Sequence, residues 1–143
     1  MLKYILTCSM LLLPNLSKAD EHSIIGGDQV EKGAYKFVAS LLYKGGDLWY
    51  DHTCGASLIR EDVVLTASHC VDGAGPEDFE VSAGRTSLDE DIAGGQRRNI
   101  SKIVMHEDYD FRTVDNDIAL IFLEKPFELN EDVELISYLS LPI

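Results

Sequence analysis

Hydrophobic residues along this chain come in short runs that glycine, proline and acidic residues separate. The runs are rich in β-branched, aliphatic and aromatic residues, and the 3.6-residue spacing of an amphipathic helix is nearly absent. They predict β-strands at residues 37–43, 53–60, 63–65, 79–83, 98–105 and 117–123. Six short strands with turn residues between them predict an all-β domain, either an antiparallel barrel or a sandwich.

The first nineteen residues have the pattern of a secretory signal peptide. Lys3 gives a positive start, residues 5–13 form a short apolar core that Pro14 ends, and residues 17–19 place small residues at the cleavage positions. The apolar core is too short to span a bilayer, and no later segment approaches about eighteen apolar residues in a row. We therefore expect a secreted, extracellular protein without a membrane anchor.

The charge balance is strongly acidic. The chain carries 12 Lys and Arg against 25 Asp and Glu, and removing Lys3 and Lys18 with residues 1–19 changes the formal charge from -13 to -15. A surface of this sign repels phosphate groups, so nucleic acid and anionic membranes are poor partners.

Two cysteines, Cys54 and Cys70, remain after Cys8 leaves with the signal. In an oxidising compartment their simplest use is one disulfide, which would close a loop of about fifteen residues and stabilise the fold by about 3 kcal/mol. A zinc site that adds His52 and His69 to the two cysteines is the alternative, although its spacing matches no common zinc motif.

One histidine stands where a buried strand gives way to small residues. Val-Val-Leu at 63–65 leads through Ala67 and Ser68 to His69. A histidine fixed beside a rigid strand can accept and return a proton near neutral pH. The alternative is an ordinary structural histidine that is hydrogen-bonded within the fold.

An acidic segment, Asp-Asn-Asp at 115–117, stands directly before an apolar run. Asp117 is expected to begin a strand that is buried on both faces, where a carboxylate must be paired or richly hydrogen-bonded. One interpretation is a solvated turn that caps the strand. The other is that Asp117 faces His69, fixes its tautomer and stabilises the protonated ring.

A glycosylation triplet, Asn-Ile-Ser, occupies residues 99–101. In an exported chain Asn99 is a candidate N-glycosylation site.

Four segments, taken in order, resemble the successive signatures of trypsin/chymotrypsin-type serine proteases. They are Ile-Ile-Gly-Gly at 24–27, Cys-Gly-Ala-Ser-Leu-Ile at 54–59, Leu-Thr-Ala-Ser-His-Cys at 65–70 and Asp-Asn-Asp-Ile-Ala-Leu at 115–120. The resemblance extends over residues 24–143 and covers the N-terminal half of such a protease. It implies a six-stranded antiparallel Greek-key barrel, the first of the family's two barrels, preceded by a short propeptide-like segment at 20–23.

The same resemblance implies roles for individual residues. His69 would be the general base, Asp117 its orienting carboxylate, and Cys54 and Cys70 the disulfide that braces the histidine loop. Ser57 lies in the family's packing strand and is not a candidate nucleophile. Ser68 replaces the more usual alanine and is expected to be tolerated without new chemistry.

The family's Gly-Asp-Ser-Gly-Gly-Pro segment, which carries the nucleophile, does not occur in this sequence. A His-Asp pair without that serine and its oxyanion hole cannot form an acyl-enzyme, so we expect this chain alone to be inactive. We expect it to be an N-terminal fragment of a longer protease that lacks its second barrel.

The resemblance also implies a zymogen in which cleavage frees Ile24 as a new N-terminus. Ser23 precedes that bond where the family usually has arginine or lysine, so a trypsin-like activator would not cut there. Residues 84–96 correspond to a loop that binds calcium in some members, but Arg85, Ile92 and Gly95 stand at the ligand positions. We therefore expect no metal and no cofactor.

The expected function is that of a secreted serine endopeptidase that acts on protein or peptide substrates by Ser-His-Asp acyl transfer. Its expected partners are the missing C-terminal barrel and protease inhibitors. The alternative is a non-catalytic homologue that serves as an extracellular binding module through its acidic surface, and a structural barrel without a partner is the third interpretation.

Overall fold

The structure is a computed structural model that describes residues 30, 31, 33–45, 50–86 and 95–137. The chain divides into two units, Met1–Val30 and Glu31–Ile143, and all described residues except Val30 belong to the second. The expected signal peptide at 1–19 and the segment at 20–23 lie outside the described residues, as do Ile24 and the acidic residues 89–91. Within the described part of the chain, no helix has the length and apolar character needed to cross a membrane.

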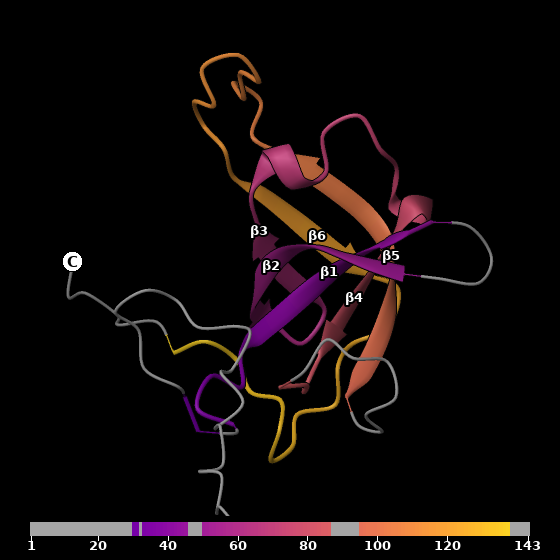
Figure 1. Ribbon diagram of the computed structural model, residues 1–143, viewed down its shortest axis with the longest axis vertical. Helices are drawn as coiled ribbons and strands as arrows, with labels where there is room; N and C mark the ends of the chain where they lie inside the picture. Colours follow the sequence, from indigo (N-terminus) through magenta and orange to yellow (C-terminus); the bar gives the residue numbers. More distant parts are fainter. Residues whose placement is uncertain (1–29, 32, 46–49, 87–94, 138–143) are drawn as a thin grey trace, which may run out of the picture. The chain divides into compact units, whose positions relative to one another are not determined.

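Six antiparallel strands close into a barrel (Figure 1). They are β1 (Val38–Lys44), β2 (Tyr50–Arg60), β3 (Val63–Thr66), β4 (Phe79–Ala83), β5 (Gln96–Met105) and β6 (Ala119–Leu123). Around the barrel the order is β1-β2-β3-β6-β5-β4, so β4 returns to lie beside β1, as in a Greek key. The expected barrel is confirmed, and the sandwich alternative is wrong.

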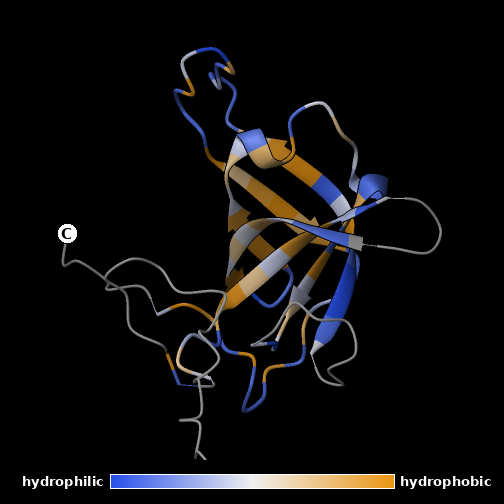
Figure 2. Cartoon of the chain, viewed as in Figure 1, coloured by the Kyte–Doolittle hydropathy of each residue, from blue (hydrophilic) through white to orange (hydrophobic). Residues whose placement is uncertain are grey.

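All six strands contribute residues to the barrel interior, and where a strand contributes several they alternate, because side chains in a strand point to opposite faces in turn. Leu41, Leu58, Val64, Val81 and Ile121 are fully buried there. Figure 2 shows hydrophobic residues along the strands and mainly hydrophilic residues in the loops. Burying each such side chain contributes about 1.5–3 kcal/mol, and these residues are therefore what holds the barrel closed.

The last strand differs from its prediction in two respects. It begins at Ala119 rather than Asp117, and its residues alternate between buried and half-buried rather than being buried on both faces. Asn116 has a positive φ of 56°, and the Ile118 amide donates to the Asn116 carbonyl at 2.8 Å. This tight turn prevents residues 116–118 from joining the β3–β6 ladder, so Asp117 lies just before the strand.

The ladder between β3 and β6 decides where the chemistry-bearing residues meet. Thr66 is paired with Ala119. The chain beyond Thr66 and the chain before Ala119 therefore leave the barrel at the same end. There a short 3-10 helix, η1 (Ser68–Cys70), lies beside the loop that connects β5 to β6 (Figure 1). A second 3-10 helix, η2 (Pro76–Asp78), follows before β4.

Candidate active site

The turn after β3 holds its histidine between two buried neighbours. Ser68 has no exposed surface and Cys70 is 8% exposed, whereas the side chain of His69 is 55% exposed. A single 3-10 turn explains this arrangement, because consecutive residues of such a turn point in different directions. The core therefore fixes the backbone of η1 while the imidazole projects toward solvent.

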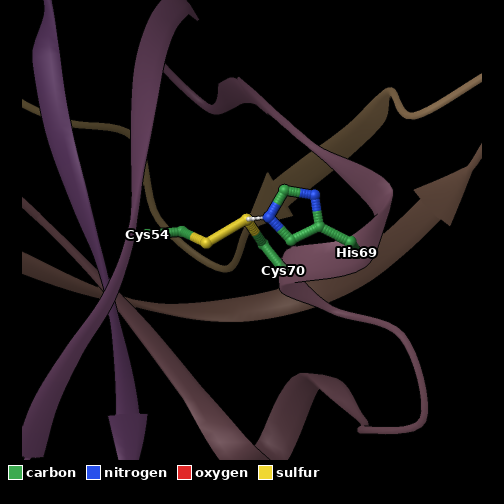
Figure 3. Close-up of side chains that lie close together, drawn as sticks. All are labelled: Cys54, His69 and Cys70. Carbon is green, nitrogen blue, oxygen red and sulfur yellow. Dashed lines mark hydrogen bonds between the residues drawn. A yellow bond between two sulfur atoms is a disulfide. The ribbon is translucent and has the colours of Figure 1, made fainter. Parts of the chain in front are cut away.

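Cys54 of β2 and Cys70 of η1 form a disulfide with an S–S distance of 2.07 Å (Figure 3). The ligand atoms of Cys54, His69 and Cys70 lie within 4.8 Å of one another, and His52 is not part of this group. Zinc binds cysteine as a thiolate, and sulfur atoms that are bonded to each other carry no thiolate charge. The disulfide is confirmed, and the zinc alternative is wrong.

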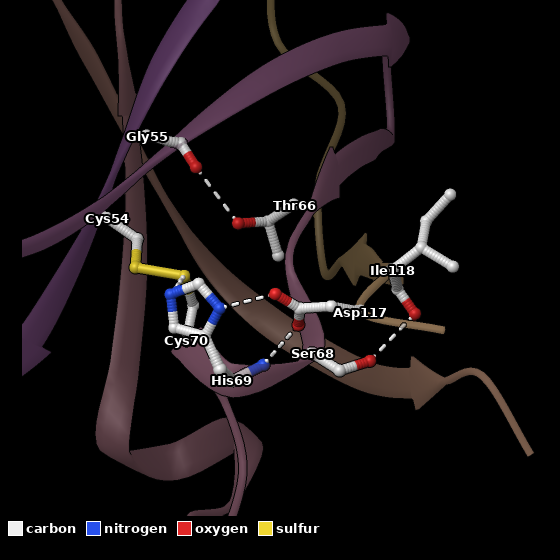
Figure 4. Close-up of polar contacts among 8 residues, drawn as sticks. All are labelled: Cys54, Gly55, Thr66, Ser68, His69, Cys70, Asp117 and Ile118. Atoms are coloured by element: carbon white, nitrogen blue, oxygen red, sulfur yellow. Dashed lines mark hydrogen bonds and ion pairs between the residues drawn. A yellow bond between two sulfur atoms is a disulfide. The ribbon is translucent and has the colours of Figure 1, made fainter. Parts of the chain in front are cut away.

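Asp117 meets His69 through both of its carboxylate oxygens (Figure 4). Oδ2 lies 2.6 Å from the ring nitrogen Nδ1, and Oδ1 accepts the backbone N–H of His69 at 2.8 Å. One carboxylate thus fixes the backbone and the ring of the same residue. With Asp117 ionised, Nδ1 carries the proton and donates it, which leaves the lone pair of Nε2 free to accept another.

The hydrogen bonds from His69 lower the pKa of Asp117 below its ordinary value. The ring contributes most, the backbone N–H of His69 comes next, and the positive charge of the ring and the Ser68 N–H add to the effect, while burial opposes it. The side chain of Asp117 is 19% exposed, so water reaches part of the carboxylate. At neutral pH Asp117 is therefore an ionised carboxylate that accepts the hydrogen bonds of His69.

The ring nitrogen Nε2 lies 3.4 Å from Sγ of Cys70 (Figure 3). The disulfide therefore closes one side of the imidazole and restricts its movement toward the barrel.

Two hydroxyl groups fasten the histidine turn to its surroundings. Thr66 Oγ1 donates to the Gly55 carbonyl at 2.9 Å, and Ser68 Oγ donates to the Ile118 carbonyl at 2.8 Å (Figure 4). The second bond joins η1 to the residue that follows Asp117. The sequence drew attention to Ser68 only as a substitute for alanine, and this tie to the aspartate loop was missed because it depends on a contact between distant segments.

The loop at residues 106–118 shapes the solvent side of the site. Burial and the carboxylates of Asp117, Asp72 and Asp110 raise the pKa of the Tyr109 phenol. Tyr109 is therefore uncharged at neutral pH and lies in the negative field of these carboxylates. Sequence reasoning did not single it out, because nothing in its own neighbourhood indicates proximity to Asp72.

The other candidate residues lie apart from the pair. Ser57 is half-buried in β2 and pairs with Val38 and Leu65, as expected for a packing strand. Asn99 is exposed on β5. A surface cavity of about 450 Å³ lies between the chain after η1 and the second half of β5, and neither His69 nor Asp117 lines it.

Comparison with known proteins places this chain in a family. The family model described as Trypsin matches residues 24–142. Vitellin-degrading protease of Bombyx mori is 32% identical over 113 residues, which cover 79% of this chain and 40% of that protein. Chymotrypsin-like elastase family member 1 is 39% identical in Felis catus and 37% identical in Macaca fascicularis, in each case over 78% of this chain and 42% of the relative. The chain spans about 40% of the length of these curated relatives. With a closed barrel, a joined His-Asp pair and a matching family model over most of its length, the chain belongs to the trypsin family of serine proteases.

Proposed function

We propose that this chain supplies the general base and its orienting carboxylate to a secreted serine endopeptidase. The observation that carries the proposal is the 2.6 Å contact between His69 Nδ1 and Asp117 Oδ2, made by a histidine whose side chain is 55% exposed. A pair in this arrangement suits proton transfer to and from a hydroxyl nucleophile.

In this proposal Nε2 of His69 takes the proton of a serine hydroxyl as the serine oxygen attacks the substrate carbonyl. The ring then carries a positive charge, and Asp117 stabilises it without itself taking a proton. The protonated ring next donates from Nε2 to the leaving amine. A water molecule repeats the sequence to release the acyl group, and His69 returns to its starting state.

The serine and the oxyanion hole would come from residues outside this sequence. Two facts support this part: the sequence contains no Gly-Asp-Ser-Gly-Gly-Pro segment, and the chain spans about 40% of its curated relatives. Protein or peptide substrates, and inhibitors that compete with them, would bind across both parts. The surface that this chain contributes is the exposed face of His69 and the neighbouring loop at 106–118.

Secretion and activation belong to the same proposal. Residues 1–19 have the composition of a signal peptide, and the Ile-Ile-Gly-Gly segment at 24–27 matches the start of the mature family chain. We propose that cleavage after Ser23 frees Ile24 as the N-terminus of the active form. The activating enzyme would have to accept a serine, which excludes one that requires arginine or lysine before the cut.

The test uses the native secreted product, captured with an antibody against residues of the barrel. N-terminal sequencing first establishes whether the chain begins at Ile24, and a phosphonate probe that reacts with activated serines is then added. The proposal predicts covalent labelling of the product that begins at Ile24. His69→Ala should abolish it, whereas Ser57→Ala, in the packing strand, should leave it unchanged.

Absence of labelling in a product that demonstrably begins at Ile24 would overturn the enzyme proposal and favour the extracellular binding module. Labelling that disappears in the Ser57 variant instead of the His69 variant would show that the base and nucleophile are assigned wrongly.

A further inference from the structure

We propose that Asn99 carries an N-linked glycan on the outer face of β5. The proposal rests on the proposed secretion, because oligosaccharide is attached in the secretory pathway. Asn99 is exposed, and Ile100, which separates it from Ser101, is 5% exposed and points into the core. The acceptor asparagine therefore faces outward, and the middle residue of the triplet is not proline.

The side-chain amide of Asn99 makes two long hydrogen bonds. Its Oδ1 accepts from Lys44 Nζ at 3.4 Å, and its Nδ2 donates to Glu124 Oε2 at 3.3 Å. Both distances are long for hydrogen bonds between such groups, so both contacts are weak. Glycosylation replaces one of the two Nδ2 hydrogens, and the other can still donate to Glu124. Attachment thus costs the folded barrel little.

The chemistry balances with a lipid-linked oligosaccharide diphosphate as donor. A bond forms between Nδ2 and the anomeric carbon of the sugar, and the bond between that carbon and the diphosphate oxygen breaks. The lipid diphosphate leaves with the electron pair, and the displaced Nδ2 proton neutralises part of its charge.

The barrel also indicates when the transfer occurs. Ser101 Oγ donates to the carbonyls of Phe122 and Leu123 at 3.0 and 3.3 Å, and the Asn99 carbonyl accepts the Glu124 amide at 2.9 Å. The acceptor triplet is thus tied to the segment around the end of β6 once the barrel has closed. The transferase needs the triplet in an accessible form, so the modification belongs to the nascent chain before β5 and β6 pair.

The glycan lies well away from the His-Asp pair. Asn99 is six residues before Met105, which is paired with Ala119 next to the site, and a strand of that length extends about 20 Å. The oligosaccharide would cover the opposite end of β5 and leave His69 accessible. A glycosylated chain can therefore present the same site as an unmodified one.

The experiment translates the full chain in a cell-free system with microsomes and compares protease-protected products before and after treatment with an N-glycan amidase. The wild type should show a larger mass that the amidase removes. Asn15 and Ser17 form a second triplet within the expected signal peptide, so variants must assign the glycan. Asn99→Gln and Ser101→Ala should lose the shift completely, and Ser101→Thr, which keeps the triplet, should retain it.

A second set of reactions replaces residues 1–19 by a signal peptide of proven export. A protected but unshifted product in that set overturns the glycan proposal, and so does a shift that persists in Asn99→Gln. A product that is protected and shifted only with the replacement signal supports the Asn99 site while contradicting secretion by the chain's own leader. The experiment therefore distinguishes failure of the glycan proposal from failure of the secretion proposal.

Discussion

The two segments that form the site are held in different ways. The histidine turn at residues 66–71 is anchored by the core, since Thr66, Ser68, Cys70 and Val71 are all buried and a disulfide joins the turn to β2. The aspartate loop at residues 106–118 is mostly exposed, and its Phe111 is 65% exposed. His69 is thus positioned by packing, whereas Asp117 is positioned by local turns and by its bonds to His69.

The aspartate loop compensates with a dense set of local hydrogen bonds. The Val114 amide donates to the Asp110 carbonyl at 2.7 Å, and Asn116 Nδ2 donates to the Asp108 carbonyl at 2.9 Å. One partner of a hydrogen-bonded His-Asp pair can thus lie on an exposed loop, provided that the other partner is fixed and the two are joined directly.

The largest expected effect comes from removing the charge that joins the two segments. In the proposed full-length enzyme, Asp117→Asn should lower kcat by about 10⁴-fold, the magnitude established for the aspartate of a Ser-His-Asp triad, because the amide favours the wrong tautomer of His69. Steady-state kinetics measure this loss. Asp115→Asn is the matched control in the same loop, and an equal loss there would contradict a specific role for Asp117.

Removing the brace of the histidine turn should cost stability. The double variant Cys54→Ala, Cys70→Ala opens a loop of about fifteen residues and should lower the free energy of unfolding by about 3 kcal/mol. Urea denaturation of the isolated chain measures the change. If the double variant kept the stability of the oxidised wild type, anchoring of the turn would have to be assigned to core packing alone.

Variants of the two hydroxyl residues, Thr66 and Ser68, can distinguish anchoring of the histidine turn to the barrel from its anchoring to the aspartate loop. Thr66→Val and Ser68→Ala should each destabilise the chain by about 1 kcal/mol. Ser68→Ala should cause the smaller loss of stability, because the Ile118 carbonyl still accepts a hydrogen bond from the His106 amide at 3.0 Å. Only Ser68→Ala should alter the downfield proton resonance of His69 Nδ1, and a similar alteration in Thr66→Val would refute a separate tie to the loop.

The loop should gain stability from a change that the barrel would not tolerate. Val114 has a positive φ of 60°, which is unfavourable for a β-branched residue, and its side chain is 51% exposed. Val114→Gly should therefore stabilise the chain, by less than about 1 kcal/mol after the larger entropy loss of glycine. The same substitution at Val104, in β5, should destabilise it. Thermal unfolding of both variants checks the contrast, and destabilisation by both would remove the case for strain in the loop.

The smallest expected effect is the dependence of stability on acid. Because the pKa of Asp117 is lowered on folding, the carboxylate contributes stability that is present above about pH 4 and is lost as pH falls through the lowered value. The pair is partly exposed, and solvent screening keeps this contribution small. The difference in unfolding free energy between wild type and Asp117→Asn should shrink below about pH 4. A constant difference down to strongly acidic pH would show that the charge does not contribute.

Much of the barrel could be predicted because the sequence patterns that specify its strands are local. All six strands follow from alternating or β-branched runs between turn residues, and β4 has the predicted bounds. The start of β6 could not be predicted in the same way, because the apolar run beginning at Ile118 resembles a continuous strand. A tight turn at Asn116 interrupts the strand pattern, and the residue types alone do not indicate its positive φ.

The features of the site also divide into those that the local sequence indicates and those that it does not. The positions of His69 and Asp117 at the ends of apolar runs were visible in the sequence, and the family motifs supplied the expectation that they meet. Three contacts were not visible in the sequence. They are the hydrogen bond from the His69 backbone to Asp117, the one from Ser68 to the Ile118 carbonyl, and the proximity of Tyr109 to Asp72. Each of them joins atoms whose residues lie far apart in sequence and are brought together only by the closed barrel.

The pairing of Thr66 with Ala119 has a consequence for folding kinetics. β2 and β3 are neighbours in sequence, but β3 finds β6 only after a loop of more than fifty residues has closed, and such long-range contacts form slowly because the chain entropy is lost first. The bond between His69 and Asp117 cannot form before this step. The Nδ1 proton resonance of His69 would therefore report the moment of barrel closure during refolding.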